Sequence, residues 1–311
     1  MIQKRHQGLH QWLILFLLVL VWGSSFILIK KSLLYFSALE VGILRIVITF
    51  IFLLPLAIKN IARVSRKQKY YLAISGVIGS LIPSLLFAFA QSGIDSSLAG
   101  SLNSLTPLFT LMLGLVFFSL KTRWYNVVGV FIGLLGALGL IYVSGENGFV
   151  FNFKYSFLVI IATICYAFNV NFIKYFLKEV NSVTITALTF FYIGIPASVF
   201  LLFFTDFTDK IIHQKEVWAG IGYLATLSIV GTGIALIFFN KLIKLTSPVF
   251  ASSVTYLIPV VAIIWGIVDG EVFNLSYVLW FLLILLGVFL VNAKPHHKMN
   301  ISSIVLFWKK K

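Results

Sequence analysis

The sequence has few charged residues, and acidic residues are the scarcest of them. Only 11% of its 311 residues are charged, with 9 Asp and Glu against 24 Lys and Arg, whereas 60% are hydrophobic and the mean hydropathy is +1.04. Soluble domains typically carry about 25% charged residues. The composition therefore excludes a water-soluble globular fold and predicts an all-α integral membrane protein.

Cysteine and histidine are scarce as well. Cys165 is the single cysteine, which excludes an internal disulfide and a multi-cysteine metal site. The five histidines lie outside the long apolar runs, and the sequence has no HExxH pattern, no phosphate-cradling loop and no carboxylate pair within an apolar run. The sequence thus predicts no catalytic residue, no metal site and no cofactor, and an enzyme is not expected.

Long apolar runs predict the membrane spans. A helix needs about 20 apolar residues to cross a bilayer core. Ten runs approach this length: residues 12–29, 41–58, 71–91, 97–118, 127–143, 157–177, 185–204, 217–239, 249–268 and 277–291. The first run lacks a small-x-small cleavage site, so we interpret it as a retained span rather than a signal peptide.

The charged residues at the ends of these runs predict an orientation. With the N-terminus inside, most of the 24 Lys and Arg residues fall at inner ends, and every acidic residue except Glu179 falls at an outer end. This positive-inside pattern predicts that both termini are cytoplasmic. It also accounts for the formal net charge of +15, so no nucleic-acid partner is expected.

One segment of the chain occurs twice. SLAGSLNSLTPLFTLMLG, residues 97–114, returns as VFASSVTYLIPVVAIIWG, residues 249–266, with Pro107 matched by Pro259 at a constant offset (259 − 107 = 152). A proline inside an apolar helix leaves a backbone carbonyl without its donor, which is costly unless protein or water in a cavity satisfies it. The doubled segment therefore predicts a pocket between two halves of the molecule.

A second match links the first span of each half. Trp22 is matched by Tyr166 at a constant offset (166 − 22 = 144). We therefore predict one five-helix repeat over residues 10–144 and a second over residues 155–295. Because five is odd, the second repeat enters the membrane in the opposite sense, and the expected fold is ten transmembrane helices arranged as two inverted repeats. Such symmetry is typical of carriers that work by alternating access.

These residues resemble a known family. The first-span WGSSFILIKKSL, the second-span LRIVITFIFLLPLAI with Arg45, and the doubled proline segment are similar to the EamA family of the drug/metabolite transporter superfamily, over residues 10–295. The resemblance implies a secondary transporter in a bacterial inner membrane, often an exporter of small metabolites such as amino acids. Exchange of sugar phosphates or nucleotide sugars, known in the wider superfamily, is the alternative substrate class.

Polar and aromatic side chains within the spans are the candidate lining of a substrate cavity. A polar group in hydrocarbon either joins helices or lines a wet path. The candidates are Trp22, Ser25, Arg45, Gln91, Asn103, Tyr166, Asn169, Asn240, Thr255 and Tyr256. Asn169 is preferred to Asn171 because it shares a helical face with Tyr166. Pro107 and Pro259 are expected to shape the helices that border the cavity.

Two of these candidates have alternative roles. Trp22 fits helix packing as well as a cavity wall, and Arg45 lies about one turn from the outer end of its span, where an arginine can snorkel to the headgroups. A cavity with one inward basic residue suits amphipathic zwitterions better than phosphorylated solutes. Acids and histidines map to loops and span ends, so facilitated diffusion or solute exchange is expected rather than proton coupling.

The C-terminal residues 296–311, which end in NISSIVLFWKKK, form a basic amphipathic tail. It is expected to bind anionic lipid at the inner face. A receptor or assembly scaffold and a membrane-embedded enzyme are the alternative functions. A scaffold has no need of matched proline helices, and an enzyme needs a polar cluster near one interface. The sequence does not set the oligomeric state.

Overall fold

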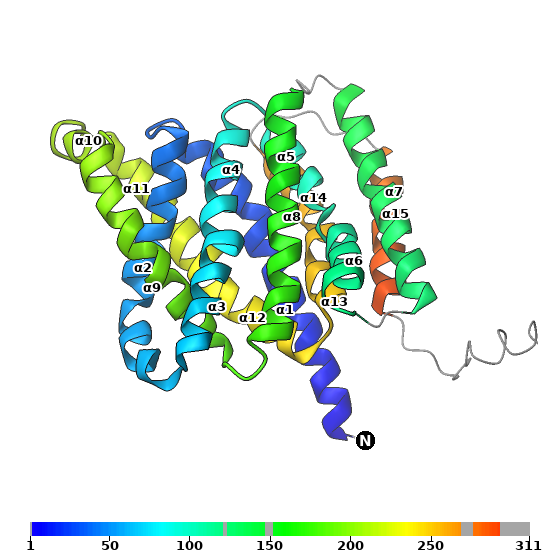
Figure 1. Cartoon of the computed structure of the whole chain (residues 1–311). Coiled ribbons are helices and arrows are strands. Elements are labelled where there is room, and N and C mark those ends of the chain that lie inside the picture. The colour runs from blue at the N-terminus through cyan, green and yellow to red at the C-terminus, as the bar shows by residue number, and fades with distance from the viewer. Residues whose placement is uncertain (1, 121–122, 147–151, 269–275, 293–311) are drawn as a thin grey trace, which may run out of the picture.

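The computed structural model describes residues 2–120, 123–146, 152–268 and 276–292, and these form helices joined by short connections (Figure 1). The elements are α1 (Ile2–Ser32), α2 (Ala38–Asn60), η1 (Ile61–Arg63), α3 (Arg66–Gly76), η2 (Val77–Leu81), α4 (Ile82–Gln91), α5 (Ser96–Asn103), α6 (Thr106–Phe117), α7 (Trp124–Glu146), α8 (Phe153–Phe176), α9 (Ser182–Phe204), α10 (Phe207–His213), α11 (Val217–Ser228), η3 (Ile229–Ile234), α12 (Ala235–Leu245), α13 (Pro248–Ser252), α14 (Val254–Val268) and α15 (Ser276–Asn292).

The described helices confirm an all-α membrane protein. Eight of the described helices are long and apolar enough to cross a membrane, if consecutive elements that continue across a short break are counted as one helix. A shorter apolar stretch covers Trp124–Gly136. The helices α7 and α15 occupy the places of the fifth and tenth expected spans and pack against each other. The count of ten spans stays a prediction. The tail, residues 296–311, lies outside the described residues.

Matching caps start the second helix of each half. The Ser37 hydroxyl accepts a hydrogen bond from the Glu40 backbone N–H, and the Glu40 carboxylate accepts one from the Ser37 backbone N–H. The helix α2 therefore begins with a capping box. Asn181 accepts a hydrogen bond from the Thr184 backbone N–H at the start of α9. The two caps lie at the repeat offset (181 − 37 = 144).

Helix pairs recur when the two halves are exchanged. The helix α1 of the first half packs on α14 of the second half. Its counterpart in the second half, α8, packs on α6 of the first half. Likewise α4 packs on α8, and α11 and α12 pack on α1. The pairs α2 with α9 and α7 with α15 join equivalent helices (Figure 1). This pattern is expected of duplicated halves related by an approximate two-fold axis.

Two spans contain a short π-helical segment at equivalent places. η2 separates α3 from α4, and η3 separates α11 from α12, at the 152-residue offset (229 − 77 = 152). Pro83 has no N–H for the Gly79 carbonyl, which accounts for the irregular turn in the first case. In the second case the Thr232 hydroxyl donates to the Leu227 carbonyl at 3.1 Å and replaces a backbone donor. π-segments of this kind are frequent at functional sites.

The predicted orientation can be tested on two exposed residues of this fold. The α2–α3 connection lies on the side of the N-terminus, and α10 lies on the opposite side (Figure 1). In a Cys165→Ala background, Arg66→Cys is expected to react with an impermeant maleimide from the cytoplasm only, and Thr208→Cys from outside only. Labelling of intact cells and of inverted vesicles measures this, and reaction of both cysteines from one face contradicts the orientation.

Candidate functional site

A central pocket lies between the two halves. Its empty volume is about 1080 Å³ when the space open to solvent is included. Its wall comprises Trp22, Ser25, Phe26, Ile29, Arg45, Ile46, Ser75, Gly79, Ser80, Ser84, Phe87, Asn103, Thr106, Tyr166, Asn169, Val170, Ile173, Ile185, Thr186, Thr189, Phe190, Gly231, Thr232, Leu236, Phe239, Asn240, Ser252, Thr255 and Ile258. Both halves contribute to it, and the size suits a small organic molecule.

Two aromatic pairs at equivalent positions stand in this wall. The rings of Trp22 and Phe239 meet edge to face with centroids 4.8 Å apart, and those of Tyr166 and Phe87 are stacked at 5.9 Å. Exchanging the halves converts one pair into the other, because Tyr166 follows Trp22 at 144 residues and Phe239 follows Phe87 at 152. Each aromatic pair of the pocket therefore combines one ring from each half.

The π-segment η3 and Ser228, the last residue of α11 before it, bind side chains of the first half. The Trp22 indole N–H donates to the Gly231 carbonyl at 2.9 Å, and the Thr49 hydroxyl donates to the Ser228 carbonyl at 3.0 Å. A Cβ at Gly231 would lie 2.9 Å from Ser25 Oγ. The irregular turn thus exposes carbonyls that helices of the other half use, and glycine permits their close approach.

The π-segment η2 has the equivalent contact. The side chain of Asn169 lies directly on Gly79, so that a Cβ added to the glycine would overlap the amide. The Ser75 hydroxyl donates to Asn169 Oδ1 at 2.7 Å. Asn169 and Gly79 are the counterparts of Ser25 and Gly231 (169 − 25 = 144, 231 − 79 = 152). In each half, therefore, one polar side chain packs closely against the equivalent glycine of the other half.

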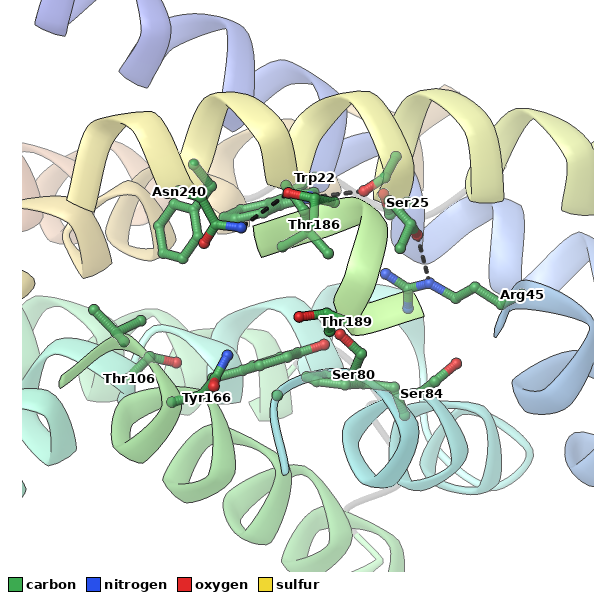
Figure 2. A pocket seen from close by; sticks show the side chains of 18 of the residues that line it. Trp22, Ser25, Arg45, Ser80, Ser84, Thr106, Tyr166, Thr186, Thr189 and Asn240 are labelled. Carbon is green, nitrogen blue, oxygen red and sulfur yellow. Dashed lines mark hydrogen bonds between the residues drawn. The ribbon is translucent and has the colours of Figure 1, made fainter. Parts of the chain in front are cut away.

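Arg45 brings a positive charge into the pocket. Its Nε–H donates to the Thr232 hydroxyl at 2.8 Å, which ties α2 to η3. Figure 2 shows the guanidinium reaching from α2 into the space between Ser25 and Trp22 on one side and Ser80 and Tyr166 on the other. Among the described residues that line the pocket, Arg45 alone is charged. The guanidinium thus points into the pocket.

Hydroxyl and amide groups complete the polar wall. Asn240 donates from its amide to the Thr186 hydroxyl at 3.0 Å. Thr189 is 5% exposed, and its hydroxyl has no hydrogen-bond partner in the part of the chain that the structure describes. Thr189 also occupies the position of Arg45 in the second half (189 − 45 = 144). The charge is therefore present in only one half of a wall that is otherwise closely matched.

The two prolines lie beside the pocket rather than in its wall. Pro107 follows the break between α5 and α6, and Pro259 lies within α14. Pro107 lacks the N–H that would bind the Asn103 carbonyl, and Pro259 lacks the N–H that would bind the Thr255 carbonyl. Asn103 and Thr255 both line the pocket. The Thr106 hydroxyl donates to the Asn103 carbonyl at 2.6 Å and so satisfies it.

Eight of the ten expected cavity residues lie in this wall, and Gln91 and Tyr256 do not. Gln91 lies at the end of α4, where it accepts a hydrogen bond from Ser96 at 3.2 Å. Tyr256 is fully buried, and its hydroxyl donates to the Val130 carbonyl of α7 at 3.1 Å. Asn171 donates to the Thr110 and Ala167 carbonyls, which leaves Asn169 as the pocket amide of α8.

Sequence reasoning missed the hydroxyl-bearing part of the wall. These residues are Ser75, Ser80, Ser84, Thr106, Thr186, Thr189, Thr232 and Ser252. Serine and threonine are common packing residues in membrane helices, so their presence alone is not a signal. The repeat offset was the available signal, since it pairs Ser80 with Thr232 and Gly79 with Gly231 (232 − 80 = 152).

Charged groups near the helix ends serve structural roles. Lys174 donates to the carbonyls of Ile243, Lys244 and Thr246 at 2.8, 3.1 and 2.6 Å, and so caps the C-terminus of α12. Glu40 is 2% exposed and pairs with Lys210 of α10 at 2.6 Å. Among the described residues, no group of three or more His, Cys, Asp or Glu is arranged to hold a metal ion.

Comparison with known proteins identifies the chain. The model of the EamA-like transporter family matches residues 11–142 and again residues 153–293. An uncharacterized transporter of Archaeoglobus fulgidus is 27% identical over 285 residues, covering 91% of this chain and 99% of its own length. The uncharacterized inner membrane transporter YedA of Escherichia coli K12 is 26% identical over 297 residues, covering 90% and 92%.

A solved structure shows the same fold. This crystal structure of a protein aligns with a TM-score of 0.65 at 18% identity, over 89% of this chain and 94% of the other. The doubled family match, the duplicated helix pairs and the pocket between the halves describe a multi-pass membrane transporter and not an enzyme. The chain belongs to the EamA-like transporter family, within the drug/metabolite transporter superfamily.

Proposed function

We propose that this protein is a secondary carrier that exports small metabolites such as amino acids by alternating access, from the inner membrane of a bacterial cell with both termini in the cytoplasm. One observation carries the proposal: the pocket is walled by equivalent segments of both halves, including the aromatic pairs Trp22–Phe239 and Tyr166–Phe87. Two matched halves can exchange conformations and expose one site to either face in turn.

The chemistry of the wall favours an amphipathic organic solute. Aromatic rings offer an apolar surface, and the amides and hydroxyls offer directed hydrogen bonds. Arg45 is the single cation among the described lining residues, whereas a sugar phosphate or nucleotide sugar calls for several. Sugar-phosphate or nucleotide-sugar exchange is therefore the weaker alternative. A receptor or scaffold function gains no support from a polar pocket shared by the two halves.

A metabolite screen tests the proposal. Cells that overproduce the protein are compared with cells that lack it, and the medium and cytosol of both are analysed by mass spectrometry. A carrier of this kind should enrich a small set of metabolites in the medium and deplete the same set in the cytosol. An unchanged metabolite profile, with the protein shown to be folded and in the membrane, contradicts the proposed function.

The indole of Trp22 offers a variant for this assay. Trp22→Phe keeps a ring against Phe239 but loses the 2.9 Å hydrogen bond to the Gly231 carbonyl, and we expect the export rate to fall about fivefold. Trp12, which is 40% exposed on the same helix and outside the pocket wall, is the matched control, and Trp12→Phe should export at the wild-type rate. Equal rates for both variants contradict a role of the Trp22–Gly231 contact.

A further inference from the structure

We propose that the solute is a monoanionic carboxylate with an aromatic or apolar body, that Arg45 binds its carboxylate, and that the membrane potential drives its export. This inference rests on the proposed export of small metabolites. It replaces amino acids, the example given there, with carboxylates that lack an ammonium group, and it adds the energy source. It begins with the guanidinium. Arginine stays protonated in proteins, and a charge held away from water is costly unless an opposite charge or several hydrogen bonds compensate it.

Within the part of the chain that the structure describes, Arg45 has no counter-ion. Nε donates to Thr232, and the two terminal nitrogens donate no hydrogen bond within the described part of the chain. No aspartate or glutamate lines the pocket among the described residues. Glu40, the acid nearest to Arg45 along the chain, is bound by Lys210 and by the Ser37 N–H and hydroxyl. The guanidinium therefore presents the edge formed by its two terminal nitrogens, whose paired N–H donors match the two oxygens of a carboxylate.

Hydroxyl groups around the guanidinium suit the same ligand. The Thr189 hydroxyl lines the pocket, is buried, and has no hydrogen-bond partner among the described residues. Figure 2 places Thr189 and Ser80 on the same side of the guanidinium. A buried hydroxyl without a partner is unfavourable, and a bound carboxylate oxygen would accept a hydrogen bond from it. The aromatic pairs then contact the rest of the solute, because a ring or alkyl body gains from apolar surface.

Charge balance separates a monoanion from a zwitterion. A monoanion and Arg45 together are neutral, which lowers the cost of holding both away from water. A zwitterion leaves one net positive charge in the pocket, and its ammonium meets amides and hydroxyls but no carboxylate among the described lining residues. The pocket therefore favours a carboxylate that has no free ammonium group.

The net charge of the solute determines what drives it. Arg45 belongs to the protein, so each transport cycle moves one negative charge across the membrane. A cell interior that is negative expels such an anion, and a tenfold change in its distribution ratio corresponds to about 59 mV. No titratable group of the described pocket wall is an acid or a histidine, which fits export driven by potential without a bound proton.

A charge series in proteoliposomes tests the inference. Radiolabelled phenylpyruvate, phenylalanine and phenethylamine share an aromatic body and carry charges of −1, 0 and +1 at pH 7. Valinomycin with a tenfold K⁺ gradient sets the potential. With the interior positive, phenylpyruvate is expected to accumulate up to about tenfold, and with the interior negative it should be expelled. Phenylalanine and phenethylamine should compete with it at least tenfold more weakly than unlabelled phenylpyruvate does.

Variants locate the effect. Arg45→Gln should lower phenylpyruvate flux at least tenfold, and Arg45→Lys should retain part of it because the charge remains. Lys59, exposed near the end of the same helix and outside the pocket wall, gives the matched control Lys59→Gln, which should transport normally. If Arg45→Gln does not purify as a folded protein, the charge series on the wild-type protein decides alone.

Several outcomes would overturn the inference. These are phenylpyruvate flux no faster than in protein-free liposomes, flux that ignores the imposed potential, or competition that is equal across the series. Transport of phenylalanine but not of phenylpyruvate would support a carrier function and contradict a monoanionic solute. A metabolite screen without any exported solute would instead count against the proposed function itself.

Discussion

Replacing Gly79 with alanine is expected to destabilise the protein and to lower transport at least tenfold. A Cβ at this position would overlap the amide of Asn169 and lie 3.0 Å from the Asn169 Cβ, so the whole asparagine side chain must move. Overpacking of this kind costs about 1–3 kcal/mol, and loss of the hydrogen bond from Ser75 costs about 1 kcal/mol more. The displaced amide would then obstruct the pocket.

Two variants control this experiment. Gly222→Ala should be neutral or slightly stabilising, because a Cβ there meets nothing within 4 Å and alanine favours a helix. The double variant Gly79→Ala with Asn169→Ala removes the overlap with the amide, leaves only the 3.0 Å contact between the two Cβ atoms, and should regain most of the lost stability. Thermal unfolding in detergent and flux in proteoliposomes are the measurements. A double variant as unstable as Gly79→Ala alone would show that the glycine is needed for another reason.

Glu40→Gln is expected to destabilise the protein by about 2–3 kcal/mol. Glu40 Oε2 lies 2.6 Å from Lys210 Nζ, and the Glu40 side chain is only 3% exposed. Removing one partner of a buried pair costs about 3–5 kcal/mol, and the estimate here is lower because the Lys210 side chain, 22% exposed, can reach solvent. Glutamine still suits the third position of the capping box, so the variant tests the ion pair and not the start of α2.

The exposed pair Lys178–Glu179 provides the control. Its side chains are 71% and 77% exposed with a separation of 3.8 Å, so Glu179→Gln should leave the unfolding temperature unchanged. In the variant Glu40→Gln with Lys210→Met, no unpaired charge is left, and part of the stability should return. The unfolding temperature of purified protein in detergent measures both effects. A Glu40→Gln protein as stable as Glu179→Gln would contradict a structural ion pair between α2 and α10.

Local properties of the sequence determined the class of the protein and its duplication. Hydropathy and charge are summed along short windows, so the membrane helices follow from them without knowledge of packing. The cap residues Ser37 and Asn181 likewise act within one helical turn. The match of Pro107 with Pro259 is a comparison of the chain with itself. These signals sufficed for an all-α membrane transporter with two related halves.

The tertiary structure alone decided which polar side chains meet in the pocket. A π-segment shifts the helical phase, so the regular 100° rotation per residue does not carry a prediction across η2 or η3. Gln91 was a candidate because it is a polar residue within an apolar run, and it lies outside the wall. Long-range partners were equally hidden, since Arg45 meets Thr232, and Glu40 meets Lys210, only when distant helices pack. Contacts of this kind depend on how distant helices pack, which no local property of the sequence records.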